Sequence, residues 1–216
     1  MASDEPRKEL MNALSNLSLQ EDTADLKVIC GDDTYHAHKF LLCLQSEFFR
    51  LALRKGAFPW KEQNEGIITI EAAPTNAFDQ NADDPVAIKW MMHYFYHLDY
   101  LETERPTVIS QSHLIVHTKM YALGEKYGIP GLKALALVRF EESANIHWRG
   151  AEFAEAIPVI YTSTIEQDRG LRDAVVRKTI SERTSLLRKV EIETVMKDIN
   201  QFAYDIVKEA MRCHYV

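Results

Sequence analysis

The sequence predicts an α+β domain followed by an all-helical extension, because its strand patterns are confined to the first third of the chain. Short β-prone segments occur at residues 25–30, 34–38 and 66–71. From residue 148 onward, apolar residues recur only at the three- and four-residue spacing of helices. Strands first and helices alone afterwards are typical of an α+β fold with a helical tail.

The composition is that of a folded domain and disfavours several partners. Of the 216 residues, 46% are hydrophobic and 26% are charged, and the net charge is −7. An acidic chain gains little from neutralising phosphates, so we expect no nucleic-acid partner. No apolar run approaches the ~20 residues that span a bilayer, so we expect no membrane partner either. The 3 cysteines are widely separated, which favours a reducing compartment, cytoplasmic or nuclear.

Residues 4–18 predict a short amphipathic helix within an N-terminal segment, 1–21, that is a candidate dimer arm. Asp4 can cap this helix, and Pro6 suits its first turn. Its apolar stripe consists of Leu10, Met11, Leu14 and Leu17. A helix this short is marginal alone, so the stripe must dock on its own core or on a second subunit; both alternatives stay open.

Residues 25–38 predict a β-hairpin, because a Gly-Asp-Asp turn signal separates two β-prone runs. The apolar run 39–55 predicts two short helices, since Ser46 interrupts it and is a good helix cap. A third strand is expected at 66–71, followed by a surface loop over 72–83.

The middle of the chain predicts three helices with clear start and stop signals. Asp84 and Pro85 supply the cap and the first-turn proline of the first. We expect its core side to consist of Val86, Trp90, Met91, Tyr94, Phe95 and Leu98. A second helix over 112–127 ends at the stop signal Gly-Ile-Pro, and a third covers about 132–140.

The segment 148–216 predicts helices only. We expect one over 152–161, which Pro158 should kink or end, and another over 171–180. A continuous apolar stripe predicts a single long last helix over 191–212. The charges of 166–193 sum to +1 and alternate in sign, which indicates a solvated helical face.

A series of short motifs occurs in a fixed order through most of the chain. They are D-L-K-V-I-C-G (25–31), Y-H-A-H-K-F-L-L (35–42), S-E-F-F (46–49), I-I-T-I (67–70), D-D-P (83–85), Y-F-Y-H-L-D-Y (94–100) and Y-A-L-G-E-K-Y-G-I-P-G-L-K (121–133). Together they resemble a BTB/POZ domain over residues 22–142, which implies a small three-stranded sheet covered by helices. The helical segment 148–216 is similar to the extension of stand-alone fungal members. Leu98 departs from the family, which usually has a small residue there.

The resemblance implies a non-enzymatic protein-interaction module that homodimerises. Asp25 and Lys39 match the acid–base pair of the family's dimer groove, although each could simply be exposed at the start of an element. Trp60 and Glu62 resemble the hydrophobic-x-Glu element by which some members contact a cullin, although Trp60 could instead pack on the preceding helix. The protein would then be an adaptor of a ubiquitin ligase for an unknown client. A dimerisation scaffold in a transcriptional or structural assembly is the alternative.

The sequence carries no pattern that favours catalysis or a cofactor. Its histidine pairs are His36/His38, His93/His97 and His113/His117. The last two pairs share a helix face but lack the glutamate of a zincin motif, so we expect no metal. Nucleophile elbows and phosphate-binding glycine loops do not occur, so we expect no enzyme and no cofactor. Within the resemblance, His38 has a packing role.

Overall fold

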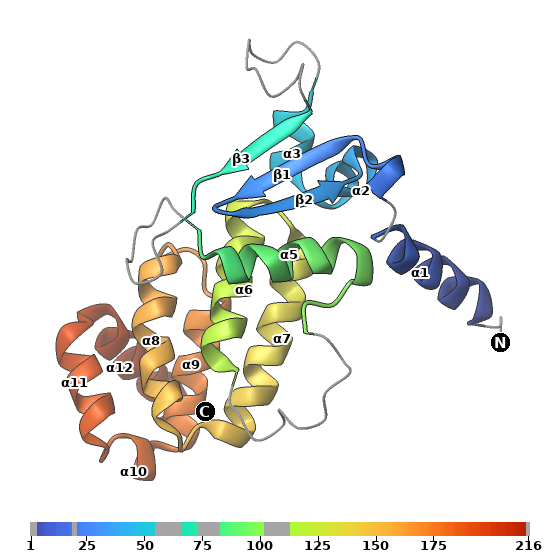
Figure 1. Ribbon diagram of the computed structural model, residues 1–216. Helices are drawn as coiled ribbons and strands as arrows, with labels where there is room; N and C mark the ends of the chain where they lie inside the picture. The colour runs from blue at the N-terminus through green and yellow to red at the C-terminus, as the bar shows by residue number, and fades with distance from the viewer. Residues whose placement is uncertain (1–3, 19–20, 55–65, 73–82, 102–112, 215–216) are drawn as a thin grey trace. The chain divides into compact units, whose positions relative to one another are not determined.

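The computed structural model describes residues 4–18, 21–54, 66–72, 83–101 and 113–214 (Figure 1). The chain forms two compact units, each made of two stretches of sequence. Unit 1 comprises Met1–Glu104 and Leu123–Lys133, and unit 2 comprises Arg105–Ala122 and Ala134–Val216. No helix among the described residues combines the length and apolarity that a membrane crossing needs.

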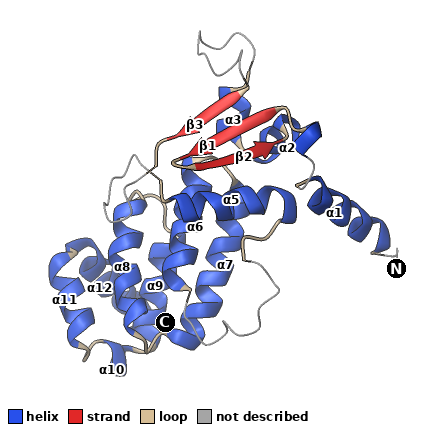
Figure 2. Cartoon of the chain, in the orientation of Figure 1, coloured by secondary structure: helices blue, strands red, loops and turns tan. Residues whose placement is uncertain are grey.

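The sheet of unit 1 has three strands, which confirms the predicted hairpin and third strand (Figure 2). They are β1 (Leu26–Cys30), β2 (Asp33–Ala37) and β3 (Ile67–Ile70), in the order β2-β1-β3. The pair β1 and β2 is antiparallel with Leu26 opposite Ala37, whereas β1 and β3 run parallel. Gly31 makes the hairpin turn possible because its φ of 60° is costly for other residues.

Two short helices follow the hairpin, as Ser46 predicted. They are α2 (Lys39–Gln45) and α3 (Glu47–Ala52). The hydroxyl of Ser46 accepts the N–H of Phe49 at 3.2 Å and donates to the carbonyl of Tyr127 at 2.6 Å. One buried side chain therefore caps α3 and ties it to the chain segment after α6.

Helix α5 (Pro85–His97) begins as predicted, with the Asp84 carboxylate accepting the N–H of Val86 at 2.9 Å. Its predicted core side is partly wrong, because Val86 and Leu98 are exposed. Val86 lies in the first turn, and Leu98 ends the helix in a left-handed conformation with φ 52°. The residues that α5 buries are Ala87, Ile88, Met91, Met92, Tyr94, Phe95 and Tyr96. The left-handed backbone at Leu98 accounts for the preference for a small residue there.

Helices α6 (Leu114–Lys126) and α7 (Pro130–His147) are joined at the predicted Gly-Ile-Pro signal. Gly128 has φ 58°, and a Cβ at this position would lie 2.7 Å from the Cβ of Glu47. Helix α7 is longer than the predicted 132–140, because burial continues beyond Phe140 to Ala144, and Trp148 directly after the helix is buried as well. Both helices cross the boundary between the two units.

The rest of unit 2 consists of α8 (Ala151–Ser163), α9 (Gly170–Ser181), α10 (Arg183–Leu186), α11 (Val190–Asp198) and α12 (Asn200–His214). Of the two predicted effects of Pro158, a kink or a helix end, the end is wrong, because α8 continues to Ser163 and its apolar face is buried on both sides of the proline. The prediction for the last helix is also wrong. The single long last helix is broken at Ile199, whose φ of −118° and ψ of 83° are not helical.

Candidate interaction surface

The start of α2 brings together the two charged residues that the sequence singled out. The backbone N–H of Lys39 donates to a carboxylate oxygen of Asp25 at 2.8 Å. A Cβ on Gly66 would lie 3.2 Å from the Asp25 carbonyl and 3.6 Å from the Lys39 Nζ. The Asp25 carboxylate thus caps a helix N-terminus, where the dipole stabilises negative charge, and the Lys39 ammonium lies nearby.

The same helix carries an exposed apolar face that the sequence analysis did not assign. Phe40 is 75% exposed and Leu44 is 66% exposed, and their four-residue spacing places them on one side of α2. Leu41 and Leu42 already fill the buried side of this helix. The sequence could have indicated this face, because α2 is short and apolar on both sides. One of the two sides must then face solvent or a partner.

His38 lies between this face and the core. Its ring Nδ1 is 3.0 Å from the hydroxyl of Tyr96, and its Nε2 is 2.9 Å from the hydroxyl of Thr23. The His38 N–H donates to the same Tyr96 hydroxyl at 3.1 Å. The imidazole therefore connects the start of α2 to α5 and to the 3-10 turn η1 (Glu21–Thr23), which is a structural role.

Helix α1 (Glu5–Leu17) packs against α5 of its own chain, although it has no fully buried residue. Met11, Leu14 and Leu17 are half-buried, whereas Leu10 is 60% exposed. The stripe is thus covered only in part within one chain. Docking of α1 on a second subunit stays a prediction.

The other chemically notable side chains are protonated thiols or packed histidines. Burial raises the pKa of Cys30 and of Cys43, which disfavours reactive thiolates. The rings of His93 and His97 stack at 3.9 Å, and His117 is buried. Among the described residues, no group of three potential ligands could hold a metal ion. Trp60 and Glu62 lie outside the described residues.

The fold and this surface define a small α+β interaction domain with a helical extension. Residues 14–137, more than half of the chain, match the BTB/POZ domain family, so the chain belongs to that family. BTB domains are protein–protein interaction modules rather than enzymes. The chain is also similar to BTB/POZ domain-containing protein 1 of Schizosaccharomyces pombe, with 32% identity over 80 residues. That match covers 36% of this chain and 6% of the relative, so the chain spans a small part of that protein.

Proposed function

We propose that this chain is a homodimerising interaction module, and that its dimer surface consists of α1 and the exposed side of α2. The observation that carries the proposal is the exposure of Phe40 and Leu44 on a helix whose other side is already buried. Full burial of such side chains is worth about 1.5–3 kcal/mol each. In a twofold dimer both copies bury the same two side chains, so the stabilisation from each is gained twice, which favours association.

The charged pair at the start of α2 would set the register of this dimer. Lys39 directly precedes Phe40, and its N–H donates to Asp25, so the apolar face has a charged border at the start of α2. Complementary charges at the border of an interface fix orientation more than they add affinity. The exposed Leu10 of α1 would add further apolar area.

Light scattering of the full chain and of two point variants tests the dimer. In dilute solution we expect the wild type to have the mass of two chains and Phe40→Asp to have the mass of one, because a buried carboxylate without a partner is costly. Ile146→Asp is the matched control, since Ile146 on α7 is 73% exposed; it should stay dimeric. A wild-type monomer, or an unchanged Phe40→Asp dimer, would refute this surface.

A chain lacking residues 1–20 tests α1 separately. If α1 docks on a second subunit, this deletion should lower the mass or raise the dimer dissociation constant at least about tenfold. An unchanged dimer would mean that Leu10, Met11, Leu14 and Leu17 pack only within their own chain.

We further propose that the dimer recruits a cullin through Trp60 and Glu62 and so serves as a ubiquitin-ligase adaptor. The support is the Trp-Lys-Glu sequence that follows α3, because tryptophan is favoured as an interface anchor. Capture by a cullin N-terminal domain should occur with the wild type and fail with Trp60→Ala/Glu62→Ala. Equal or absent capture of both chains would favour the alternative, a dimerisation scaffold without a ligase connection.

A further inference from the structure

Helix α12 of unit 2 exposes an apolar stripe on the side opposite its buried face. Tyr204 is 60% exposed, Val207 is 51% exposed and Met211 is 60% exposed, and their spacing of three and four residues aligns them. Phe202 and Ile206 fill the buried side. Aromatic residues and methionine are enriched in protein interfaces, so the stripe is a candidate contact surface.

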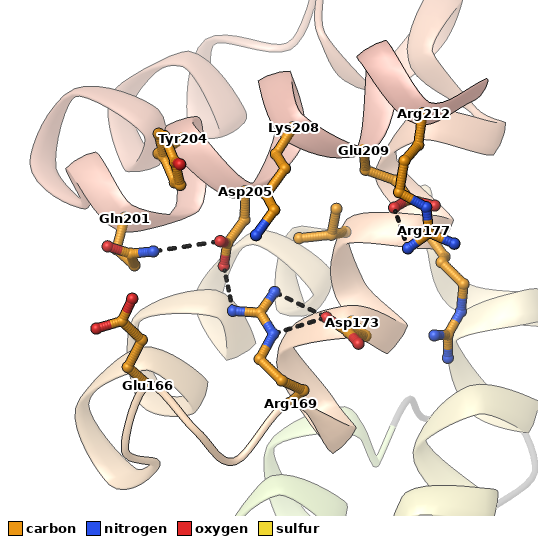
Figure 3. A pocket seen from close by; sticks show the side chains of 11 residues that line it. Glu166, Arg169, Asp173, Arg177, Gln201, Tyr204, Asp205, Lys208, Glu209 and Arg212 are labelled. Atoms are coloured by element: carbon orange, nitrogen blue, oxygen red, sulfur yellow. Dashed lines mark hydrogen bonds and ion pairs between the residues drawn. The ribbon is translucent and has the colours of Figure 1, made fainter. Parts of the chain in front are cut away.

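A polar hollow of about 320 Å³ runs beside this stripe, between α12, α9 and the segment before α9 (Figure 3). The charged side chains at the centre of the hollow pair with one another, because Arg169 contacts Asp173 at 2.7 Å and Asp205 at 3.0 Å. Tyr204 lines the same hollow, so the stripe and the hollow form one surface.

The two ends of the hollow carry opposite charge. Glu166 lies at the same end of the hollow as Gln201, near the start of α12 (Figure 3). Lys208 and Arg212 lie toward the C-terminus of α12. Among the residues that the structure describes, Glu166 and Lys208 have no ion-pair partner. Arg212 reaches Glu209 at 3.3 Å but is 79% exposed. The surface is therefore acidic at one end, basic at the other and apolar along its side.

We propose that this face of α12 docks, antiparallel, on the same face of a second copy of the chain. A twofold axis that passes beside α12, at right angles to the helix and at the level of Val207, places the start of one helix opposite the end of the other. Because 1.5 Å separates successive residues along a helix, Tyr204 then lies at about the level of the second Met211. The same operation places the acidic end of each hollow opposite the basic end of its copy.

A second copy fits this surface better than an unrelated acidic helix. An acidic helix would be attracted by Lys208 and Arg212 but repelled at the Glu166 end. A second copy satisfies both ends and covers both stripes at once. Because the face involves essentially one helix, we expect a small interface and weak association of isolated chains.

The proposed contact is separate from the α2 surface, and the two together have a distinct consequence. In a protein with two different twofold interfaces each molecule contacts two others, so the assembly, whether a closed tetramer or an open chain, is larger than a dimer. The wild type should then grow in mass with concentration, beyond that of two chains.

Sedimentation velocity in a Phe40→Asp background isolates the α12 contact. We expect concentration-dependent association of Phe40→Asp, weakened at least about tenfold by adding Val207→Asp. Val138→Asp is the matched control, since Val138 on α7 is 51% exposed; it should change nothing. A Phe40→Asp chain that stays monomeric at every concentration, or a Val207→Asp change without effect, would overturn the proposal.

A charge exchange tests the antiparallel arrangement itself. Arg212→Glu alone and Glu166→Arg alone should each weaken association, and the two together should restore it, because the exchanged charges again face one another. Failure of the double variant to recover would overturn the arrangement, provided that circular dichroism shows all variants folded. The two proposals can also fail separately. If Val207→Asp lowers the mass of the wild-type chain and Phe40→Asp leaves it unchanged, the α12 contact holds and the α2 dimer is wrong.

Discussion

The buried His117 of α6 should make the protein less stable in mild acid. Its side chain is 4% exposed, and burial, Arg139 on α7 and the neighbouring His113 together lower its pKa from 6.5 to about 3. The folded protein therefore keeps this imidazole neutral, whereas the unfolded chain protonates it below about pH 6.5. The stabilising contribution is complete above that pH and declines as the pH falls toward 3.

The size of the effect follows from the two pKa values. A difference of one pKa unit corresponds to about 1.4 kcal/mol, so the full difference between 6.5 and about 3 is worth roughly 5 kcal/mol. At pH 5 the unfolded chain has already bound the proton, and the loss relative to pH 7.5 is about 2 kcal/mol. Such a loss is a large share of the stability of an ordinary domain.

Urea unfolding at pH 7.5 and pH 5.0, followed by circular dichroism, measures this loss. In His117→Gln, the difference between the two pH values should be smaller than in the wild type by about 2 kcal/mol. Thr118→Val is the matched control, because Thr118 is equally buried but does not titrate. An equal pH dependence of His117→Gln and wild type would refute the reasoning.

Three further substitutions test single contacts by urea unfolding at pH 7.5. Tyr127→Phe removes the 2.5 Å bond that the Tyr127 hydroxyl donates to the buried Asp83 carboxylate, and should cost about 2 kcal/mol; no loss would mean that this bond is not stabilising. Gly128→Ala combines a strained φ with a contact of 2.7 Å to Glu47, and should cost about 1–3 kcal/mol, whereas a neutral effect would show that the turn adapts. Arg172→Lys should cost roughly 2 kcal/mol, because the buried guanidinium donates to the Thr164 hydroxyl and carbonyl at once; unchanged stability would show that one bond suffices.

The parts of the fold that sequence could predict depend on neighbours in the chain. Ser46 and Asp84 cap helices with their own side chains, and Gly128 ends a helix through its own backbone conformation. The alternation of the strands likewise reflects which residues face a core. Each of these signals acts within a few residues, so it is visible without the rest of the molecule.

The parts that could not be predicted depend on packing between distant segments. The apolar period runs through Ile199 without interruption, so it does not show that α11 ends there and α12 begins at Asn200. At Pro158, burial of Phe153, Ile157 and Ile160 offsets the lost backbone hydrogen bond, which a local rule cannot weigh.

The candidate surface shows the same division. The family resemblance brought Asp25 and Lys39 to attention, because they match the acid–base pair of the family's dimer groove. The exposure of Phe40 and Leu44 could not be predicted, since it depends on which side of α2 the other elements cover. Likewise, the pattern of α12 shows an apolar helix but not that Tyr204 and Met211 face outward.

The interleaving of the two units in the sequence affects how the protein can be divided. A truncated chain that ends at residue 142 keeps part of unit 2, namely Arg105–Ala122 and the start of its second stretch. It loses Glu152, which accepts the N–H of Ile115, and Asp168, which accepts the hydroxyl of Tyr121. It also loses Arg177, the ion-pair partner of Glu141. Expression of this truncated chain should therefore yield an aggregation-prone fragment, and the whole chain is the sound unit for purification.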